Sequence, residues 1–277
     1  MRKLDCHTHI VNEQIWKQYN SRPGAADYAL VMEFLPHMVR PDLPDHSWQL
    51  CDGNRRLFLC PSVDIHRDIP AQLADIGEKM VRHPGCRVVG LKIFLTYQTG
   101  RADDARMLPI YDFARDHGLS ATFHTGLPSY HLPYDNDLYG SRVEWICNVA
   151  RQYPTVNFIA AHMGDPRYDE SIAAMQGLSN VFTDFCGAFE PGTDVAADEA
   201  GTIRQFAHAI NQFPDTWRQI LYGTDFCPPI WLEEIEKYDE TMSIIFPKEH
   251  FSDIYWHNAL RAFPKVAAYL SNDEQTL

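Results

Sequence analysis

The chain has 277 residues, of which 45% are hydrophobic and 12% aromatic, enough to bury the core of one large domain or two small ones. Its formal net charge of −13 argues against a nucleic acid or an anionic membrane as the main partner. No apolar run approaches the roughly 20 residues of a membrane span, and no apolar signal segment precedes the first strand. The seven cysteines are an odd number without a CxxC pair, so we expect a reduced, cytoplasmic protein.

The first predicted strand, residues 4–10, holds a pair of histidines. Because side chains alternate along a strand, Asp5, His7 and His9 are expected on one face. Two imidazoles on one face can bind the same metal ion, and imidazole nitrogen is the commonest donor for zinc. The pair alone could equally be a polar strand end, so its interpretation depends on residues further along the chain.

Apolar runs rich in β-forming residues recur along the whole sequence. They cover residues 4–10, 28–34, 57–63, 88–94, 121–124, 157–162, 181–185 and 220–225. Their starts are about 25 to 40 residues apart, the length of a strand–helix repeat, and helical apolar spacing lies between them at 73–81, 110–114, 143–149 and 203–210. We therefore predict an α/β fold, a single-domain (β/α)8 TIM barrel over residues 1–277. A doubly wound sheet is the alternative, although no glycine-rich phosphate-binding motif follows the first strand.

The least regular part of the sequence is residues 12–48, which contain four prolines. We expect this stretch to be an irregular insert that forms a lid or a contact in a homo-oligomer.

Polar residues interrupt or end four of the later apolar runs. Lys92 lies inside the fourth run, while His124, His162 and Asp225 end the fifth, sixth and eighth. In a barrel the C-terminal ends of all strands meet at one mouth, where catalytic groups lie. These four residues can therefore meet the two histidines of the first strand, across more than 200 residues of sequence. Any one of them alone would more often be a hydrogen-bonded core residue, but their coincidence at strand ends favours a shared site.

This set of motifs resembles the amidohydrolase superfamily, and more narrowly its amidohydrolase-related branch, which includes aminocarboxymuconate-semialdehyde decarboxylase and related aromatic-acid decarboxylases and lactonases. The resemblance covers nearly the whole chain. It depends on Asp5-x-His7-x-His9, Gly90-Leu91-Lys92, His124-Thr125-Gly126, Ala161-His162-Met163-Gly164, Gly223-Thr224-Asp225 and the stretch from His257 to Phe263. The last has Ala262 where the family usually has leucine.

The resemblance implies a divalent metal ion, most often Zn²⁺, held by His7, His9, His124 and Asp225. His162 then stays unligated beside the metal-bound water, and either His162 or Asp225 takes the water's proton during catalysis. In binuclear relatives a lysine at the position of Lys92 is carboxylated and bridges two ions, and both later histidines become ligands. We favour one ion, with Lys92 in an ion pair or bound to a substrate carboxylate, and keep two ions as the alternative.

The loops after the strands should contact a small-molecule substrate. Candidate substrate-binding residues are Tyr97, Arg101, Tyr130 and Arg167, since arginine suits carboxylates, although a loop arginine is more often a solvated charge. The predicted function is a metal-dependent hydrolase that uses metal-activated water on a C–O or C–N bond of a small carboxylated or cyclic substrate. The alternative is a metal-dependent decarboxylase of an aromatic or unsaturated acid.

Overall fold

A computed structural model describes residues 1–39, 42–128, 139–187, 189, 192–228 and 235–276. Within these residues, each of the eight predicted apolar runs coincides with a strand or overlaps one. The strands are β1 (Leu4–Thr8), β2 (Tyr28–Met32), β3 (Leu57–Cys60), β4 (Gly90–Ile93), β5 (Ser120–His124), β6 (Phe158–Ala161), β7 (Val181–Asp184) and β8 (Ile220–Leu221). Most of their residues are fully buried, as expected for strands covered on both faces.

The strands pair in parallel in two sheets, in the orders β1-β2-β3 and β4-β5-β6-β7-β8. The two sheets adjoin at two places, between β3 and β4 and between β8 and β1. At both places backbone hydrogen bonds connect the sheets, without a continuous ladder. The Lys92 amide donates to the Pro61 carbonyl (2.7 Å) between the third and fourth strands, and the Asp225 amide donates to the His7 carbonyl (2.8 Å) between the eighth and the first. The architecture is the predicted α/β fold of a (β/α)8 TIM barrel, with its ladder interrupted at these two places.

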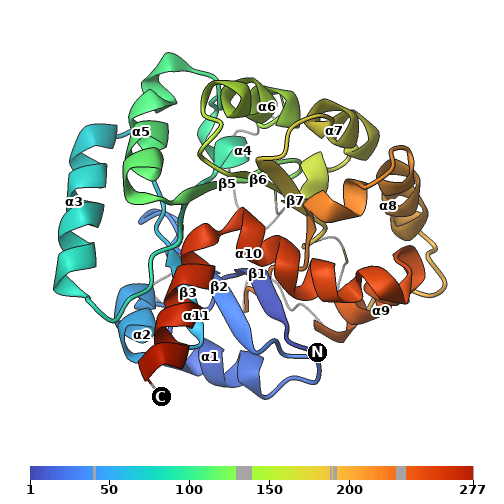
Figure 1. Ribbon diagram of the computed structural model, residues 1–277, viewed down its shortest axis with the longest axis horizontal. Helices are drawn as coiled ribbons and strands as arrows, with labels where there is room; N and C mark the ends of the chain where they lie inside the picture. The colour runs from blue at the N-terminus through green and yellow to red at the C-terminus, as the bar shows by residue number, and fades with distance from the viewer. Residues whose placement is uncertain (40–41, 129–138, 188, 190–191, 229–234, 277) are drawn as a thin grey trace.

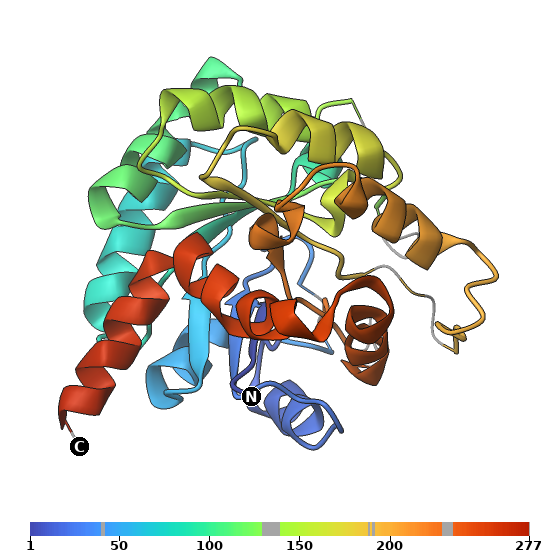
Figure 2. The same cartoon turned by 45° about the vertical axis from the view of Figure 1, so that its right-hand side comes forward.

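Helices surround the strands (Figures 1 and 2). Those described are α1 (Glu13–Asn20), α2 (Ser47–Gly53), α3 (Ile69–Arg82), α4 (Leu95–Gln98), α5 (Leu108–His117), α6 (Val143–Gln152), α7 (Tyr168–Met175), α8 (Thr202–Asn211), α9 (Ile235–Ile245), α10 (Asn258–Ala262) and α11 (Pro264–Thr276), with a π-helical turn at Asp253–His257 before α10. All four predicted helical segments are confirmed, but Val81 is 80% exposed and does not belong to the buried stripe of α3. No described helix combines the length and the apolar character that crossing a membrane requires.

Residues 12–48 are more regular than their sequence indicated. They contain α1, the whole of β2 and the start of α2, so the irregular part described within them is reduced mainly to the loop between β2 and α2. Helix α1 forms because the Asn12 side chain caps it, accepting a hydrogen bond from the Ile15 amide (3.1 Å). The structure thus adds α1 and the start of α2 to the strand already predicted at 28–34, while the assignment of 12–48 as an insert that forms a lid or an oligomer contact stays a prediction.

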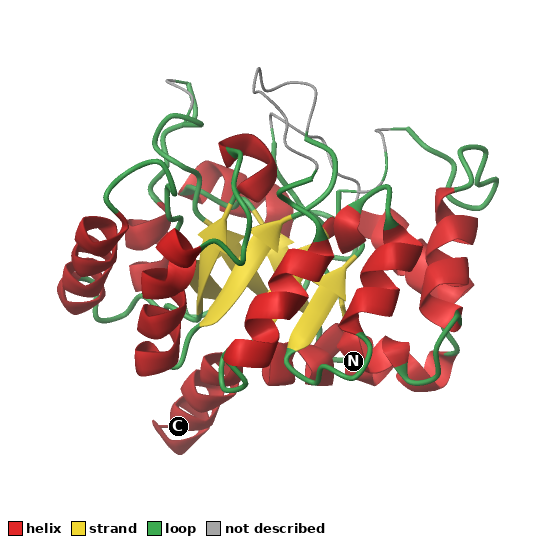
Figure 3. Ribbon diagram, turned by 90° about the horizontal axis from the view of Figure 1, so that it is seen from above, coloured by secondary structure: helices red, strands yellow, loops and turns green. Residues whose placement is uncertain are grey.

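The C-terminal helices cover the N-terminal ends of the strands. The Ser120 hydroxyl donates to the Ala262 carbonyl (2.7 Å), and the Asn258 side chain donates to the Ile220 carbonyl (2.7 Å). An inner apolar cluster joins strands to these helices through Leu4, Leu30, Phe58, Val89, Phe182, Leu221, Trp256, Ala259, Phe263 and Val266. The predicted motif from His257 to Phe263 therefore seals one end of the barrel. The opposite end, toward which the strand arrows point in Figure 3, is left to the loops.

Candidate metal centre

His7, His9 and Asp225 form a compact group at the C-terminal ends of β1 and β8. The Asp225 Oδ1 atom lies 3.5 Å from His7 Nε2 and 3.4 Å from His9 Nε2. Two donors on one tetrahedral zinc ion at about 2.1 Å lie roughly 3.4 Å apart, so the spacing of these atoms fits a single ion. The side chains are almost completely buried, apart from Asp225 at 20% exposure. We conclude that these three residues could hold a divalent metal.

The rings of the first two histidines are oriented by partners behind them. His9 Nδ1 lies 2.9 Å from the Met32 carbonyl, which can only accept, so this nitrogen carries the hydrogen and Nε2 keeps its lone pair. His7 Nδ1 lies 3.3 Å from the Asp184 carboxylate. Outer acceptors of this kind fix the tautomer of metal-binding histidines. The ring of His9 is also stacked on Phe34 at 4.3 Å between centroids.

Asp5 lies outside the centre. The pairing of β1 with β2 shifts register between Asp5 and Thr8, which breaks the regular alternation of side chains along the strand. Its carboxylate accepts hydrogen bonds from the Tyr19 hydroxyl of α1 (2.9 Å) and the Thr224 hydroxyl (2.7 Å). The expectation that Asp5 shares a face with both histidines is therefore wrong. Its position instead ties β1 to the segment that carries Asp225.

The remaining predicted residues of the centre adjoin this group. The Lys92 ammonium lies 3.0 Å from His7 Nε2, and the His162 Nε2 atom lies 3.0 Å from His124 Nδ1. The ring centroids of His7 and His162 are 5.1 Å apart. Among the described residues, His124 does not join the compact group of His7, His9 and Asp225. The structure thus brings the six residues to one barrel mouth and places His124 beside His162.

The electrostatics of the centre favour neutral imidazoles and an ionised carboxylate. Burial, followed by the Lys92 charge, lowers the pKa of His7 well below its ordinary value, and burial and His162 do the same to the pKa of His124. Burial acts to raise the pKa of Asp225, but the neighbouring histidines, His7 foremost, outweigh it and lower that pKa. Metal binding requires these protonation states.

Two of the residues have strained backbones. His162 has φ of 68° and Asp225 has φ of 57°, in the left-handed region that residues other than glycine seldom adopt. Such strain persists only where the surroundings enforce it, and it clusters at functional sites. The His162 amide is held by the Asp184 carboxylate (2.8 Å) and the Asp225 amide by the His7 carbonyl.

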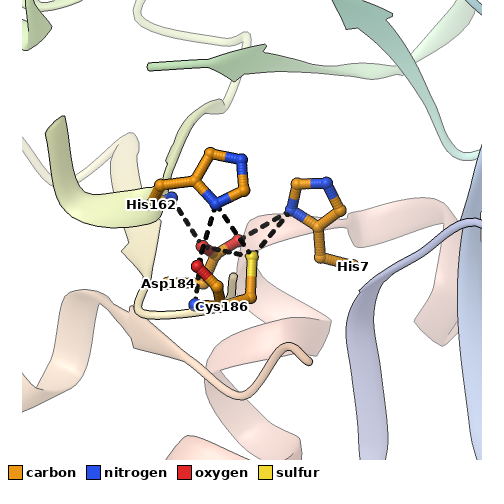
Figure 4. A group of neighbouring side chains, drawn as sticks. All are labelled: His7, His162, Asp184 and Cys186. Atoms are coloured by element: carbon orange, nitrogen blue, oxygen red, sulfur yellow. Dashed lines mark hydrogen bonds and ion pairs between the residues drawn. The ribbon is translucent and has the colours of Figure 1, made fainter. Parts of the chain in front are cut away.

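Asp184 and Cys186 are site residues that the sequence reasoning missed. Both are buried at the end of β7 and contact His7 and His162 from behind, as Figure 4 shows. The rule that singled out the other residues, a polar side chain at a strand end, applies equally to Asp184.

The predicted substrate residues are only partly near the centre. Tyr97 packs on His124 with centroids 4.8 Å apart. Arg101 instead forms two hydrogen bonds with Asp103 (2.8 Å each), and Arg167 pairs with Glu170 at 3.3 Å, 48% exposed. These arginines have the intramolecular partners typical of loop charges, so a substrate role for either stays a prediction. Tyr130 lies outside the described residues.

A family model described as "Amidohydrolase" matches residues 48–265 of the sequence. This match spans more than half of the chain. The chain belongs to the amidohydrolase family. The superfamily consists of metal-dependent enzymes, several of them decarboxylases. The matched range begins after His7 and His9, so the assignment of these two residues depends on the geometry given above. Among curated proteins, no sequence match was found.

Solved structures of this amidohydrolase fold cover nearly the whole chain. A probable 2-pyrone-4,6-dicarboxylic acid hydrolase from Acinetobacter baumannii is 12% identical (TM-score 0.64), with 95% of this chain and 100% of that chain covered. 5-Carboxyvanillate decarboxylase from Sphingomonas paucimobilis is 12% identical (TM-score 0.60; 95% and 99% covered). 4-Oxalomesaconate hydratase from Rhodopseudomonas palustris is 16% identical (TM-score 0.62; 99% and 99% covered). At these identities the similarity establishes the fold alone.

Proposed function

We propose that this protein is a metal-dependent hydrolase that cleaves a C–O or C–N bond of a small, carboxylated or cyclic substrate. The observation that supports it best is that Asp225 Oδ1 lies 3.5 Å from His7 Nε2 and 3.4 Å from His9 Nε2, the separations expected of donors on one ion, with the ligand atoms of all three residues within 4.8 Å of one another. Zn²⁺ is the ion that suits two imidazoles and a carboxylate best, and one ion is favoured over two. A divalent ion at this position would supply Lewis acidity that polarises a carbonyl group and acidifies water.

The protein's own groups divide the remaining tasks. Because neighbouring histidines keep the pKa of Asp225 low, this carboxylate serves as a ligand more readily than as a proton acceptor at neutral pH. His162 is the better base. Its Nδ1 lies 2.9 Å from the Cys186 carbonyl and therefore carries the hydrogen, so Nε2, which lies 3.0 Å from His124 Nδ1, is the nitrogen that would accept a proton.

Lys92 has a role that depends on occupancy of the centre. In the structure its ammonium uses the lone pair of His7 Nε2. One lone pair serves one partner, so a metal ion on His7 would displace this contact. The buried ammonium would then need another acceptor, and a substrate carboxylate is the acceptor that a small acidic substrate brings. If Lys92 is carboxylated, it becomes a second anionic donor and the binuclear alternative applies.

Decarboxylation of an aromatic or unsaturated acid is the second candidate, because 5-carboxyvanillate decarboxylase shares the fold over almost the entire chain. The test is to incubate the zinc-loaded protein with a panel of lactones, amides and aromatic acids in ¹⁸O-labelled water. Incorporation of ¹⁸O into an acid product without CO2 release supports the hydrolase. Release of CO2 without ¹⁸O incorporation at the cleaved bond would exclude it in favour of the decarboxylase.

A further inference from the structure

The end of β7 places an acid and a thiol directly behind the histidines of the centre. Asp184 is 1% exposed, and Cys186 is equally buried. Neither belongs to the compact group of His7, His9 and Asp225, and the proposed reaction leaves both without a task. Figure 4 shows the two side chains between His7 and His162, with contacts to both.

The Asp184 carboxylate is an acceptor shared by several donors. Its Oδ1 atom accepts from the His162 amide (2.8 Å), the Cys186 thiol (3.0 Å) and, more weakly, the Cys186 amide (3.4 Å). Its Oδ2 atom lies 3.3 Å from His7 Nδ1. One buried carboxylate therefore holds the strained backbone of His162 and the imidazole of His7 at the same time.

The same four side chains are close enough to suggest a second ion site, since their ligand atoms lie within 4.8 Å of one another. Counting hydrogens argues against it. His162 Nδ1 faces the Cys186 carbonyl, which can only accept, so that nitrogen carries a hydrogen and has no lone pair for an ion. Every remaining hydrogen of the group has an acceptor on Asp184 or on the Cys186 sulfur. The cluster is thus complete as a hydrogen-bonded unit.

We propose that Asp184, supported by Cys186, is the positioning residue of the centre: it fixes His7 with its hydrogen on Nδ1 and holds the His162 backbone, so that both rings present Nε2 to the barrel mouth. Gly223 permits this arrangement. A Cβ atom at that position would lie 3.2 Å from the His7 Cβ and 3.5 Å from the Asp184 Cβ. The expected effect of Asp184 on metal affinity rests on the proposed function. Its effect on the tautomer of His7 is independent of that function.

The test uses Asp184→Asn, which places an amide NH2 where the carboxylate accepted from His7. Nitrogen-15 NMR of the metal-free protein reports which ring nitrogen of His7 carries the hydrogen. We expect Nδ1–H in the wild type and a shift to Nε2–H in the variant. Zinc affinity, measured by competition with a chromogenic chelator, should fall about 10- to 100-fold in the variant. Asp165→Asn is the matched control, because Asp165 accepts from Tyr168 and is no part of the cluster; it should keep wild-type affinity.

The outcomes separate the two proposals. If the wild type binds no zinc, the proposed function fails, while the NMR result still decides the role of Asp184. Unchanged affinity together with an unchanged tautomer in Asp184→Asn would overturn the positioning role. If that variant does not fold, the wild-type spectrum suffices, because a wild-type His7 with its hydrogen on Nε2 would overturn the proposal without any variant.

Discussion

Removing the Tyr19 hydroxyl should destabilise the protein because that oxygen serves two buried partners. It donates to Asp5 Oδ2 (2.9 Å) and accepts from the Ala26 amide (3.1 Å), and the side chain is fully buried. Tyr19→Phe therefore removes a hydrogen bond to a buried carboxyl and an acceptor from a buried amide. Each loss costs about 1–3 kcal/mol, so we expect the free energy of unfolding in urea to fall by about 2–6 kcal/mol.

Tyr222 provides the matched control for this substitution. It is also fully buried, but its hydroxyl has no hydrogen-bond partner among the described residues. Tyr222→Phe removes an unsatisfied polar atom, so the free energy of unfolding should stay the same or rise by up to about 1 kcal/mol. If Tyr19→Phe and Tyr222→Phe change the stability equally, the account of the Tyr19 hydroxyl as the partner of both Asp5 and the Ala26 amide is wrong.

Three further predictions concern the centre and its surroundings. Gly187→Ala should abolish zinc binding in a chelator titration, because the added Cβ would lie 2.9 Å from Asp225 Oδ2 and 3.2 Å from His162 Nδ1. Gly177→Ala is the control: this glycine also has a positive φ but has open space around it, so the variant should bind zinc normally. Burial raises the pKa of Asp5 from 3.8 to about 7 against its hydrogen bonds. Because the pKa of Asp5 is higher in the folded state than in the unfolded state, the wild type should lose stability relative to Asp5→Asn as the pH rises from 4 to 7. The difference between their free energies of unfolding should change by up to about 4 kcal/mol over this range. A difference that does not change with pH would refute the raised pKa. His162→Asn should keep one zinc per chain and lose turnover, whereas loss of a metal equivalent would favour the binuclear alternative.

The sequence was sufficient for the fold because buried parallel strands leave long apolar runs. The polar residues that interrupt or end those runs are equally visible in the sequence, so Lys92, His124, His162 and Asp225 can be grouped from the sequence alone. Local irregularity was not visible. The register shift after Asp5, which separates it from His7, arises from pairing with β2 and has no signature in the five residues themselves.

The substrate side was least accessible to sequence reasoning. Whether an arginine faces a ligand or pairs within the protein depends on loop conformation, and Arg101 has its partner two residues away in Asp103. Asp184 shows the opposite case, because its position at a strand end was readable although its hydrogen bonds were not. Sequence patterns therefore locate the ends of strands, while the tautomer and pairing of each group require three-dimensional contacts.

Stoichiometric metal binding tests the central claim most directly. Purified protein loaded with Zn²⁺ and freed of excess ion should retain about one ion per chain, by elemental analysis together with a chelator titration. His9→Ala and Asp225→Asn should each lose that ion while keeping the wild-type circular dichroism spectrum, and Arg101→Ala should retain it. A wild-type protein that holds no divalent metal, or ligand variants that hold as much as the wild type, would contradict the account.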